Sequence, residues 1–330
     1  IQLIKTPMKN IYLLIMLLVL TGCVRDTNLY DYTILKGHLD NFAFTQIMNV
    51  PVKEGHCTVL TLGDDTLYYG DVSMNIIVPK HQTLTRTTDY IQCFYVPKTQ
   101  NWGFTVEYKG LLMFEDMPSG DNDYNDFIAH INLYMRCNYV PYNSTPIVTI
   151  SVNEFKPLAL GNTLQLGFGY EVRYCDTGEI IDDVNLSYDV RNDFFNNDKG
   201  FINTENSWKA YPNIYNLQQE DIAIDFVNRD FGFNWYIEVN GVKYYTAESA
   251  KFVNVDTTYT NVLTNSKTPF GLFIPNNLLS NFCWMKELSP IWDGYPDFIN
   301  WIKGKNQNPF KVRNESALYK LAIESGENIY

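Results

Sequence analysis

The residues with the clearest chemical potential lie together between positions 114 and 126. This segment reads FEDMPSGDNDYND and contains no Lys or Arg, but it holds five carboxylates: Glu115, Asp116, Asp121, Asp123 and Asp126. Because like charges repel at short range, such a group must be spread into water or gathered around a cation. Asp121, Asp123 and Asn125 occupy alternate positions, the spacing at which a tight loop directs oxygen ligands toward a hard cation such as Ca²⁺.

We therefore predict a calcium site in this segment. Asp121, Asp123 and Asp126 are the expected principal ligands, Asn125 and either Glu115 or Asp116 the auxiliary ones, and Tyr124 is expected to pack beneath the loop. The segment is not an EF-hand, since a loop starting at Asp121 would need Gly in sixth place and Glu in twelfth, where this chain has Asp126 and Asn132.

Two other interpretations of the acidic segment stay open. One is a solvated turn in which Asp and Asn serve turn geometry. The other is a pair of carboxylates in a glycoside hydrolase, although acids so close in sequence tend to share one environment, whereas catalysis needs environments that separate their pKa values.

Strands are expected on both sides of the acidic segment. Residues 105–108 and 111–114 read as two strands before it, and after it 127–136 alternate with a period of two, with Phe127, Ala129 and Ile131 on one face. A strand–loop–strand frame would hold metal ligands more firmly than a free loop.

Further strands are expected at 91–95, 147–152, 168–174, 222–226 and 235–239. Asn240-Gly241 is a strong hairpin signal because both residues tolerate positive φ. Near the end of the chain, Tyr295, Phe298, Ile299 and Ile302 have helical spacing and predict a short amphipathic helix that stops before Gly304. We predict a mainly β fold, an antiparallel, jelly-roll-like β-sandwich with two β modules as a further possibility.

Residues 190–218 are rich in Asn and Asp and are expected to form a long surface excursion. Three of its aromatic residues could stack on sugar rings or could simply cover the core: Trp208, Tyr211 and Tyr215.

The front of the chain resembles a bacterial lipoprotein signal. Met8 and Lys9 begin a basic head, residues 11–20 form an apolar run too short to span a bilayer, and the run ends in Leu20-Thr21-Gly22-Cys23. The resemblance to a lipobox implies cleavage before Cys23 and acylation of that residue, which would anchor the protein to the cell envelope, with the outer membrane as the expected location. An ordinary cleaved signal with an incidental cysteine is the alternative.

These features suggest an order of regions along the chain. Residues 1–22 would be the signal peptide, with 1–7 before the first methionine, and 23–36 the lipidated tether. An N-terminal β region would cover 37–142, a C-terminal β region 143–312 and a tail 313–330.

The composition of the chain limits the classes of partner that it can bind. The formal net charge of −12 argues against nucleic acid or an anionic membrane surface. Apart from Cys23, the chain has five cysteines, none of them close to another in sequence: Cys57, Cys93, Cys137, Cys175 and Cys283. Their pairing is therefore open, and free thiols are expected as much as disulfides.

Three blocks of the sequence resemble LruC-domain proteins, bacterial surface lipoproteins of uncharacterised function. The acidic segment 114–126 is similar to their FED…DYDYND signature, 156–169 to an ALG…GFG segment, and 268–301 to a closing segment with a YP.F..W pattern. Asn122 stands where relatives have Tyr, at a position expected to point outward. The resemblance implies a calcium-type acidic motif and supplies no activity.

The sequence thus favours a lipid-anchored binding protein with a role in adhesion, in glycan binding or in binding an envelope partner. A metal-assisted hydrolase or glycoside hydrolase is the first alternative, and a structural subunit of a surface assembly is the second.

Overall fold

The computed structural model describes residues 44–79, 90–98, 103–138, 147–211, 213–225, 229–247, 264, 268–280, 282–298 and 309–321. The predictions for the signal segment, for the tether with Cys23, and for Ile299 and Ile302 lie outside these residues.

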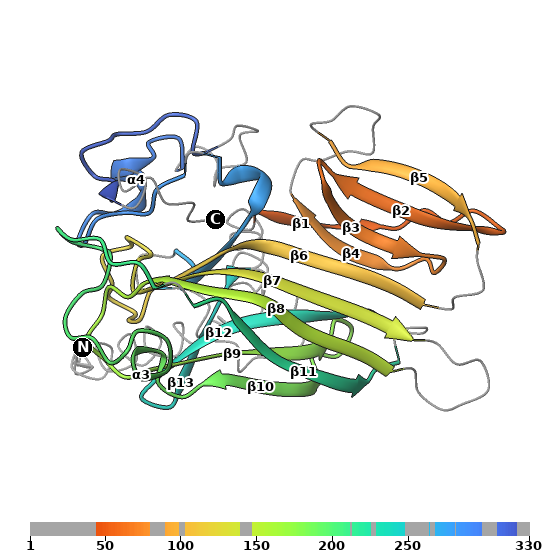
Figure 1. Cartoon of the computed structure of the whole chain (residues 1–330), viewed down its shortest axis with the longest axis horizontal. Helices are drawn as coiled ribbons and strands as arrows, with labels where there is room; N and C mark the ends of the chain where they lie inside the picture. Colours follow the sequence, from red (N-terminus) through yellow and green to blue (C-terminus); the bar gives the residue numbers. More distant parts are fainter. Residues whose placement is uncertain are drawn as a thin grey trace, which may run out of the picture.

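The described chain is mainly antiparallel β structure, as predicted (Figure 1). Its strands are β1 (Thr45–Asn49), β2 (His56–Leu62), β3 (Asp65–Gly70), β4 (Asn75–Pro79), β5 (Gln92–Pro97), β6 (Gly103–Phe114), β7 (Phe127–Asn138), β8 (Ile147–Ala159), β9 (Leu166–Tyr174), β10 (Ile180–Ser187), β11 (Tyr215–Ala223), β12 (Phe231–Val239), β13 (Val242–Tyr245) and β14 (Gly271–Pro275). Three short helical segments accompany them: α3 (Val190–Phe194), the 3₁₀ turn η2 (Asn276–Leu278) and α4 (Ile291–Gly294).

Two of the sheets form the sandwich. An eight-stranded sheet has the order β11-β8-β7-β6-β3-β2-β5, with β14 added beside β6, and a four-stranded sheet has the order β10-β9-β12-β13. Aromatic side chains fill the space between them: the Phe168 ring lies 5.1 Å from that of Phe127 and 5.4 Å from that of Phe155. Such buried rings supply most of the apolar contact area in a core of this kind.

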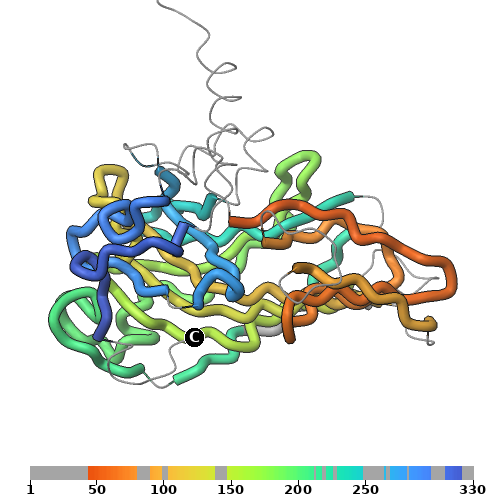
Figure 2. Tube along the Cα trace, turned by 90° about the horizontal axis from the view of Figure 1, so that it is seen from above, coloured from red at the N-terminus to blue at the C-terminus, as the bar shows by residue number. Residues whose placement is uncertain are grey.

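A second core lies on the other face of β6 and β7. Met113 and Ile128 point into it and meet Trp284 and Tyr295 from the C-terminal part of the chain, all of them fully or almost fully buried. Figure 2 shows the C-terminal segments at one end of the molecule and the first strands reaching the other end. The loop ends of β6 and β7 are therefore covered on both faces.

Several strand predictions are confirmed, and two are corrected. The strand expected at 222–226 is β11, which begins earlier, at Tyr215, and ends at Ala223. The Asn240-Gly241 hairpin joins β12 to β13 with φ values of 51° and 77°. The prediction of two strands at 105–108 and 111–114 is wrong, because both ranges belong to the single strand β6. Gly110 lies inside β6 because β14 passes so close that a Cβ there would be 2.5 Å from the Ile274 carbonyl oxygen.

The Asn/Asp-rich segment 190–218 is also not the predicted surface excursion. Phe195 and Tyr211 are buried within it, and β11 already begins at Tyr215. Its asparagines serve the backbone, since Asn196, Asn197 and Asn203 have positive φ, a conformation that Asn tolerates better than most residues.

The end of the chain agrees in part with the predicted helix. Tyr295 and Phe298 are buried, as their spacing indicated, but the short helix α4 precedes them. The boundary expected between 142 and 143 falls between β7 and β8, which are neighbours in one sheet.

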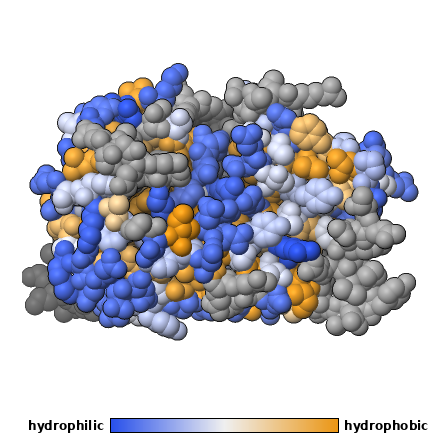
Figure 3. Space-filling view, viewed as in Figure 1, coloured by the Kyte–Doolittle hydropathy of each residue, from blue (hydrophilic) through white to orange (hydrophobic). Residues whose placement is uncertain are grey.

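The described surface shown in Figure 3 is mostly hydrophilic, with hydrophobic residues scattered among the polar ones. All five cysteines after Cys23 are free thiols. Within the part of the chain that the structure describes, no helix is both long and apolar enough to cross a membrane.

Candidate metal centre

The acidic loop between β6 and β7 wraps around the side chain of Glu115. The carboxylate is fully buried and accepts hydrogen bonds from the backbone N–H of Tyr124 at 2.5 Å and of Asn122 at 3.2 Å. Both donors have positive φ, 57° and 64°, which Tyr rarely adopts. Gly120 completes the wrap, because a Cβ at this position would lie 2.1 Å from Glu115 Oε2.

Asp123 is the second enclosed acid, with 1% of its surface exposed. Its Oδ1 accepts from the Asn125 backbone N–H at 3.1 Å, and its Oδ2 accepts from the Asn125 amide at 2.7 Å and from the Leu288 N–H at 2.9 Å. The carboxylate is therefore oriented by groups on two distant parts of the chain.

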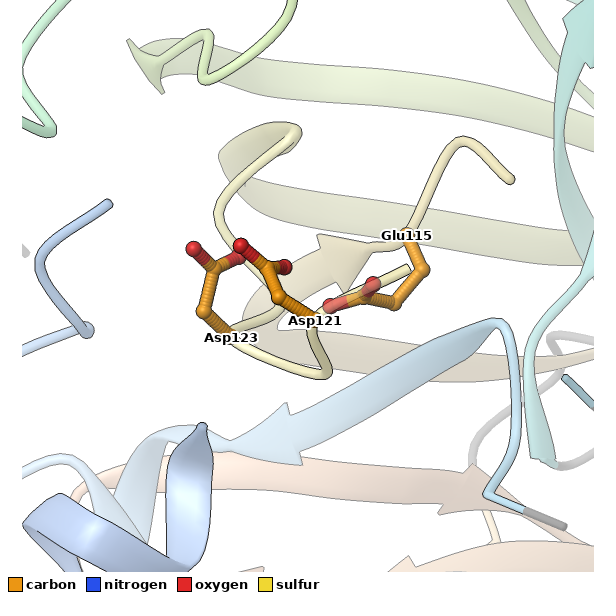
Figure 4. A group of neighbouring side chains, drawn as sticks. All are labelled: Glu115, Asp121 and Asp123. Atoms are coloured by element: carbon orange, nitrogen blue, oxygen red, sulfur yellow. The ribbon is translucent and has the colours of Figure 1, made fainter. Parts of the chain in front are cut away.

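Asp121 joins these two acids to form a compact group. One carboxylate oxygen from each of Glu115, Asp121 and Asp123 lies within 4.8 Å of the others. Figure 4 shows the carboxyl groups of Asp121 and Asp123 next to each other, with that of Glu115 directed toward Asp121. Asp121 is only half-buried, so the group has one side nearer to solvent.

Asp116 and Asp126 lie beside this group and bond to each other across the base of the loop. Asp126 Oδ2 accepts from the Asp116 backbone N–H at 2.7 Å, and the Asp126 carbonyl accepts from the Asn162 amide at 2.9 Å. The structure thus groups Asp121 and Asp123 as predicted and brings Glu115 in as a third member, whereas Asp126, expected as a principal ligand, is outside the trio.

Burial dominates the electrostatics of the loop. Loss of solvent, reinforced by neighbouring carboxylates, raises the pKa of Asp123 to about 10, and loss of solvent raises that of Glu115 to about 8. The same causes raise the pKa values of Asp116 and Asp126. Among the residues that the structure describes, no Lys or Arg forms an ion pair with any of the five acids.

Asn125 adds an unsatisfied oxygen. The residue is fully buried, and its Oδ1 has no hydrogen-bond partner within the described structure, whereas its amide nitrogen bonds to Asp123. A buried polar atom left in this way normally costs free energy. Rotating the amide by half a turn would place Oδ1 beside the Asp123 carboxylate, an arrangement that is favourable only with a cation between the two oxygens.

Segments that are far apart in the sequence hold the loop in place. Gly161 donates its N–H to the Asn125 carbonyl at 2.9 Å, and Phe270 accepts from the Glu115 N–H at 2.7 Å. The Tyr124 hydroxyl, beneath the loop as predicted, donates to the Pro269 carbonyl at 2.9 Å. The three sequence blocks that resemble LruC-domain proteins therefore meet at this loop.

One acid at the site was missed by the sequence analysis. Glu287 accepts a hydrogen bond from the Thr204 hydroxyl at 2.9 Å, and burial together with the charge of Asp121 raises its pKa to about 7. It follows the buried residue Met285 in a segment more than 160 positions from the loop, so no local pattern could have assigned it to the site.

The candidate sugar-stacking residues do not form a common surface. The Tyr211 ring is buried edge-on against Phe195, and its hydroxyl bonds to Asp198 at 2.6 Å. Trp208 is half-buried and packs beside the second core, while Tyr215 packs against the first. Their positions suit the alternative reading, in which they cover the core.

Comparison with known proteins gives a single distant likeness to report. No family model matches the sequence, so the resemblance to LruC-domain proteins stays an expectation, and no curated protein matches it. Among solved structures, the chain is similar to a protein from Bacteroides ovatus described as a "putative lipoprotein", with a TM-score of 0.41 and 14% identity over 83% of this chain and 92% of that one. This likeness is too distant to indicate a function.

Proposed function

We propose that this protein is a lipid-anchored component of the bacterial cell envelope that acts by binding a partner, and that its acidic loop holds Ca²⁺. The observation that carries the calcium site is the enclosure of Glu115 and Asp123 beside Asp121, next to a buried oxygen of Asn125. Within the described residues, no Lys or Arg forms an ion pair with these acids, and this oxygen has no hydrogen-bond partner. Carboxylate and amide oxygens are the ligands that Ca²⁺ prefers.

Burial favours a binding role over hydrolysis at this loop. A glycoside hydrolase needs two carboxylates that touch the sugar. Glu115 and Asp123 are 0% and 1% exposed and are already engaged by backbone N–H groups, so a polymeric substrate could not reach them. The cation would instead stiffen the junction at which 114–126, 156–169 and 268–298 meet.

The envelope location depends on the sequence Leu20-Thr21-Gly22-Cys23 that follows the apolar run 11–20. Two or three acyl chains on one residue are enough for durable attachment, since one chain alone binds marginally. Incorporation of labelled palmitate into the full chain, abolished by Cys23→Ser, would test this part; incorporation into Cys23→Ser would contradict it.

Calcium binding is tested by calorimetric titration of the chelator-treated protein with Ca²⁺. We expect one saturable site whose heat disappears in Asp123→Asn and persists in Asp64→Asn, a control at an exposed acid in the turn between β2 and β3. An absence of binding by the wild-type protein at millimolar Ca²⁺ would refute the site, because extracellular modules bind in roughly the 10⁻⁴–10⁻³ M range.

A further inference from the structure

An open pocket lies at one end of the four-stranded sheet, far from the acidic loop in sequence. It has a volume of about 260 Å³, and its lining comes from the start of β9, the end of β10 and the β12–β13 hairpin. Pockets for drug-sized ligands start at about 300 Å³, so this one suits a smaller guest such as one or two sugar rings.

Gly167 opens the floor of this pocket. It stands opposite Glu238 in the β9–β12 register, on the face of β9 that points away from the sandwich core. A Cβ on Gly167 would already lie 3.3 Å from the Ser187 carbonyl oxygen and 3.4 Å from the Glu238 Cβ, so any larger side chain would fill the space. The register of β10 against β9 shifts between Asn185 and Ser187, at the same level, and an irregularity of this kind bends the strand.

Polar side chains without positive charge form the walls. Asn185, Glu238, Asn240 and Gln165 line the pocket, and Glu238 is the only charged residue among them. The side-chain oxygen of Asn185 is buried and has no hydrogen-bond partner within the described structure. Amide groups both donate and accept, as the hydroxyl groups of a sugar do, so this lining matches a neutral polyol.

An exposed aromatic ring completes the pocket. Tyr188 is 78% exposed, yet its backbone is fixed on both sides: its carbonyl accepts from the Gln165 amide at 3.2 Å, and the next residue, Asp189, caps α3. An exposed tyrosine ring offers an apolar face to a ligand, and ordering it costs little conformational entropy because the side chain has only two χ angles. The hairpin fixes the backbone of Asn240, since both turn residues have the left-handed φ that the turn needs.

We propose that this pocket binds a neutral carbohydrate, with Tyr188 stacking on a sugar ring and Asn185, Asn240 and Glu238 bonding to its hydroxyl groups. The lining disfavours other classes of ligand. An anion would meet the Glu238 carboxylate, because Lys243, which stands opposite Glu238 in the β12–β13 register, is already paired with Glu171 and Asp183. A hard cation needs more carboxylates than one. This inference deepens the binding role proposed above by naming a ligand class, and it does not depend on the calcium site.

The test uses the full chain in a detergent without a sugar headgroup, with a panel of neutral disaccharides built from glucose, galactose, mannose and N-acetylglucosamine as probes. We expect saturation-transfer NMR to detect at least one of them, and calorimetry to give a Kd of roughly 10 mM or tighter. Tyr188→Ala and Asn240→Gly should each weaken this binding about tenfold, a loss of about 1.4 kcal/mol. Asn240→Gly removes the amide and keeps the φ of the turn.

Tyr95→Ala is the matched control, because Tyr95 is also an exposed tyrosine but lies on β5, in the other sheet. Binding should be unchanged in this variant. No binding by any disaccharide, or binding that Tyr188→Ala and Asn240→Gly leave intact, would overturn the proposal. The calcium-induced shift in melting temperature, measured on the same samples, separates this outcome from a failure of the metal site.

Discussion

Asp121→Asn should have opposite effects on stability with and without calcium. Asp121 is the least buried member of the acidic trio, and its carboxylate oxygen lies within 4.8 Å of those of Glu115 and Asp123. Two unit charges at that separation repel by about 3.5 kcal/mol at an effective dielectric constant of about 20. Because solvent reaches Asp121 and protons on its neighbours relieve part of this repulsion, we expect the variant to gain about 1 kcal/mol in chelator.

In calcium the same change removes a charged ligand. A site with a Kd of about 10⁻⁴ M stabilises the wild-type protein by about 1.4 kcal/mol at 1 mM Ca²⁺, and the variant should lose most of this. For a chain of this size, 1 kcal/mol corresponds to about 2–4 °C in melting temperature. Thermal melts of both proteins in chelator and at 1 mM Ca²⁺ provide the assay. A variant that is less stable in chelator and responds to calcium like the wild type would refute the reasoning.

Three other perturbations follow from the packing. Gly161→Ala should lower both the free energy of unfolding and the affinity for calcium, because the new Cβ would lie 1.9 Å from Asn125 Oδ1. Gly200→Ala is the control, since Gly200 has open space around it and a φ of +74°. This variant should lose only about 1–2 kcal/mol in urea unfolding and should bind calcium as the wild type does. Burial lowers the pKa of His130, so at acidic pH the folded state binds fewer protons than the unfolded state. The free energy of unfolding should therefore fall as the pH drops below about 6.5. His130→Gln should lose less stability than the wild type between pH 7 and pH 5, and equal losses would contradict this prediction. Phe168→Ala, in the centre of the sandwich, should cost about 3–5 kcal/mol, and a denaturation midpoint close to that of the wild type would show that the two sheets do not depend on this contact.

The sequence predicted the fold class because period-two patterns report directly on strands. The alternation from Phe127 onward marks the face of β7 that meets the four-stranded sheet, and Asn240-Gly241 marks a hairpin. The pattern could not reveal that Ile128 on the opposite face is also buried, because the residues that cover it come from a segment more than 150 positions later. Similarly, Gly110 interrupted the pattern of β6, and only the approach of β14 explains why the strand continues through it.

Only the part of the candidate metal centre that comes from one continuous segment could be predicted from the sequence. Five acids without basic neighbours pointed to 114–126, and the structure joins Glu115, Asp121 and Asp123 into one group. The spacing of the acids in the sequence gave no measure of burial, so it could not show that Asp126 lies outside this trio. It also could not identify Glu287, which comes from a distant part of the sequence. The pocket beside Tyr188 could not be predicted from a local pattern, since the start of β9, the end of β10 and the β12–β13 hairpin build it together.

The central claim, a cation held by the acidic loop, is tested most directly by an anomalous difference map from crystals of the full chain grown with Ca²⁺. We expect a peak between the carboxylates of Glu115, Asp121 and Asp123, at about 2.3–2.6 Å from their oxygens, with the Asn125 amide turned so that Oδ1 faces it. A map that shows only water at this position in saturating Ca²⁺ would contradict the account.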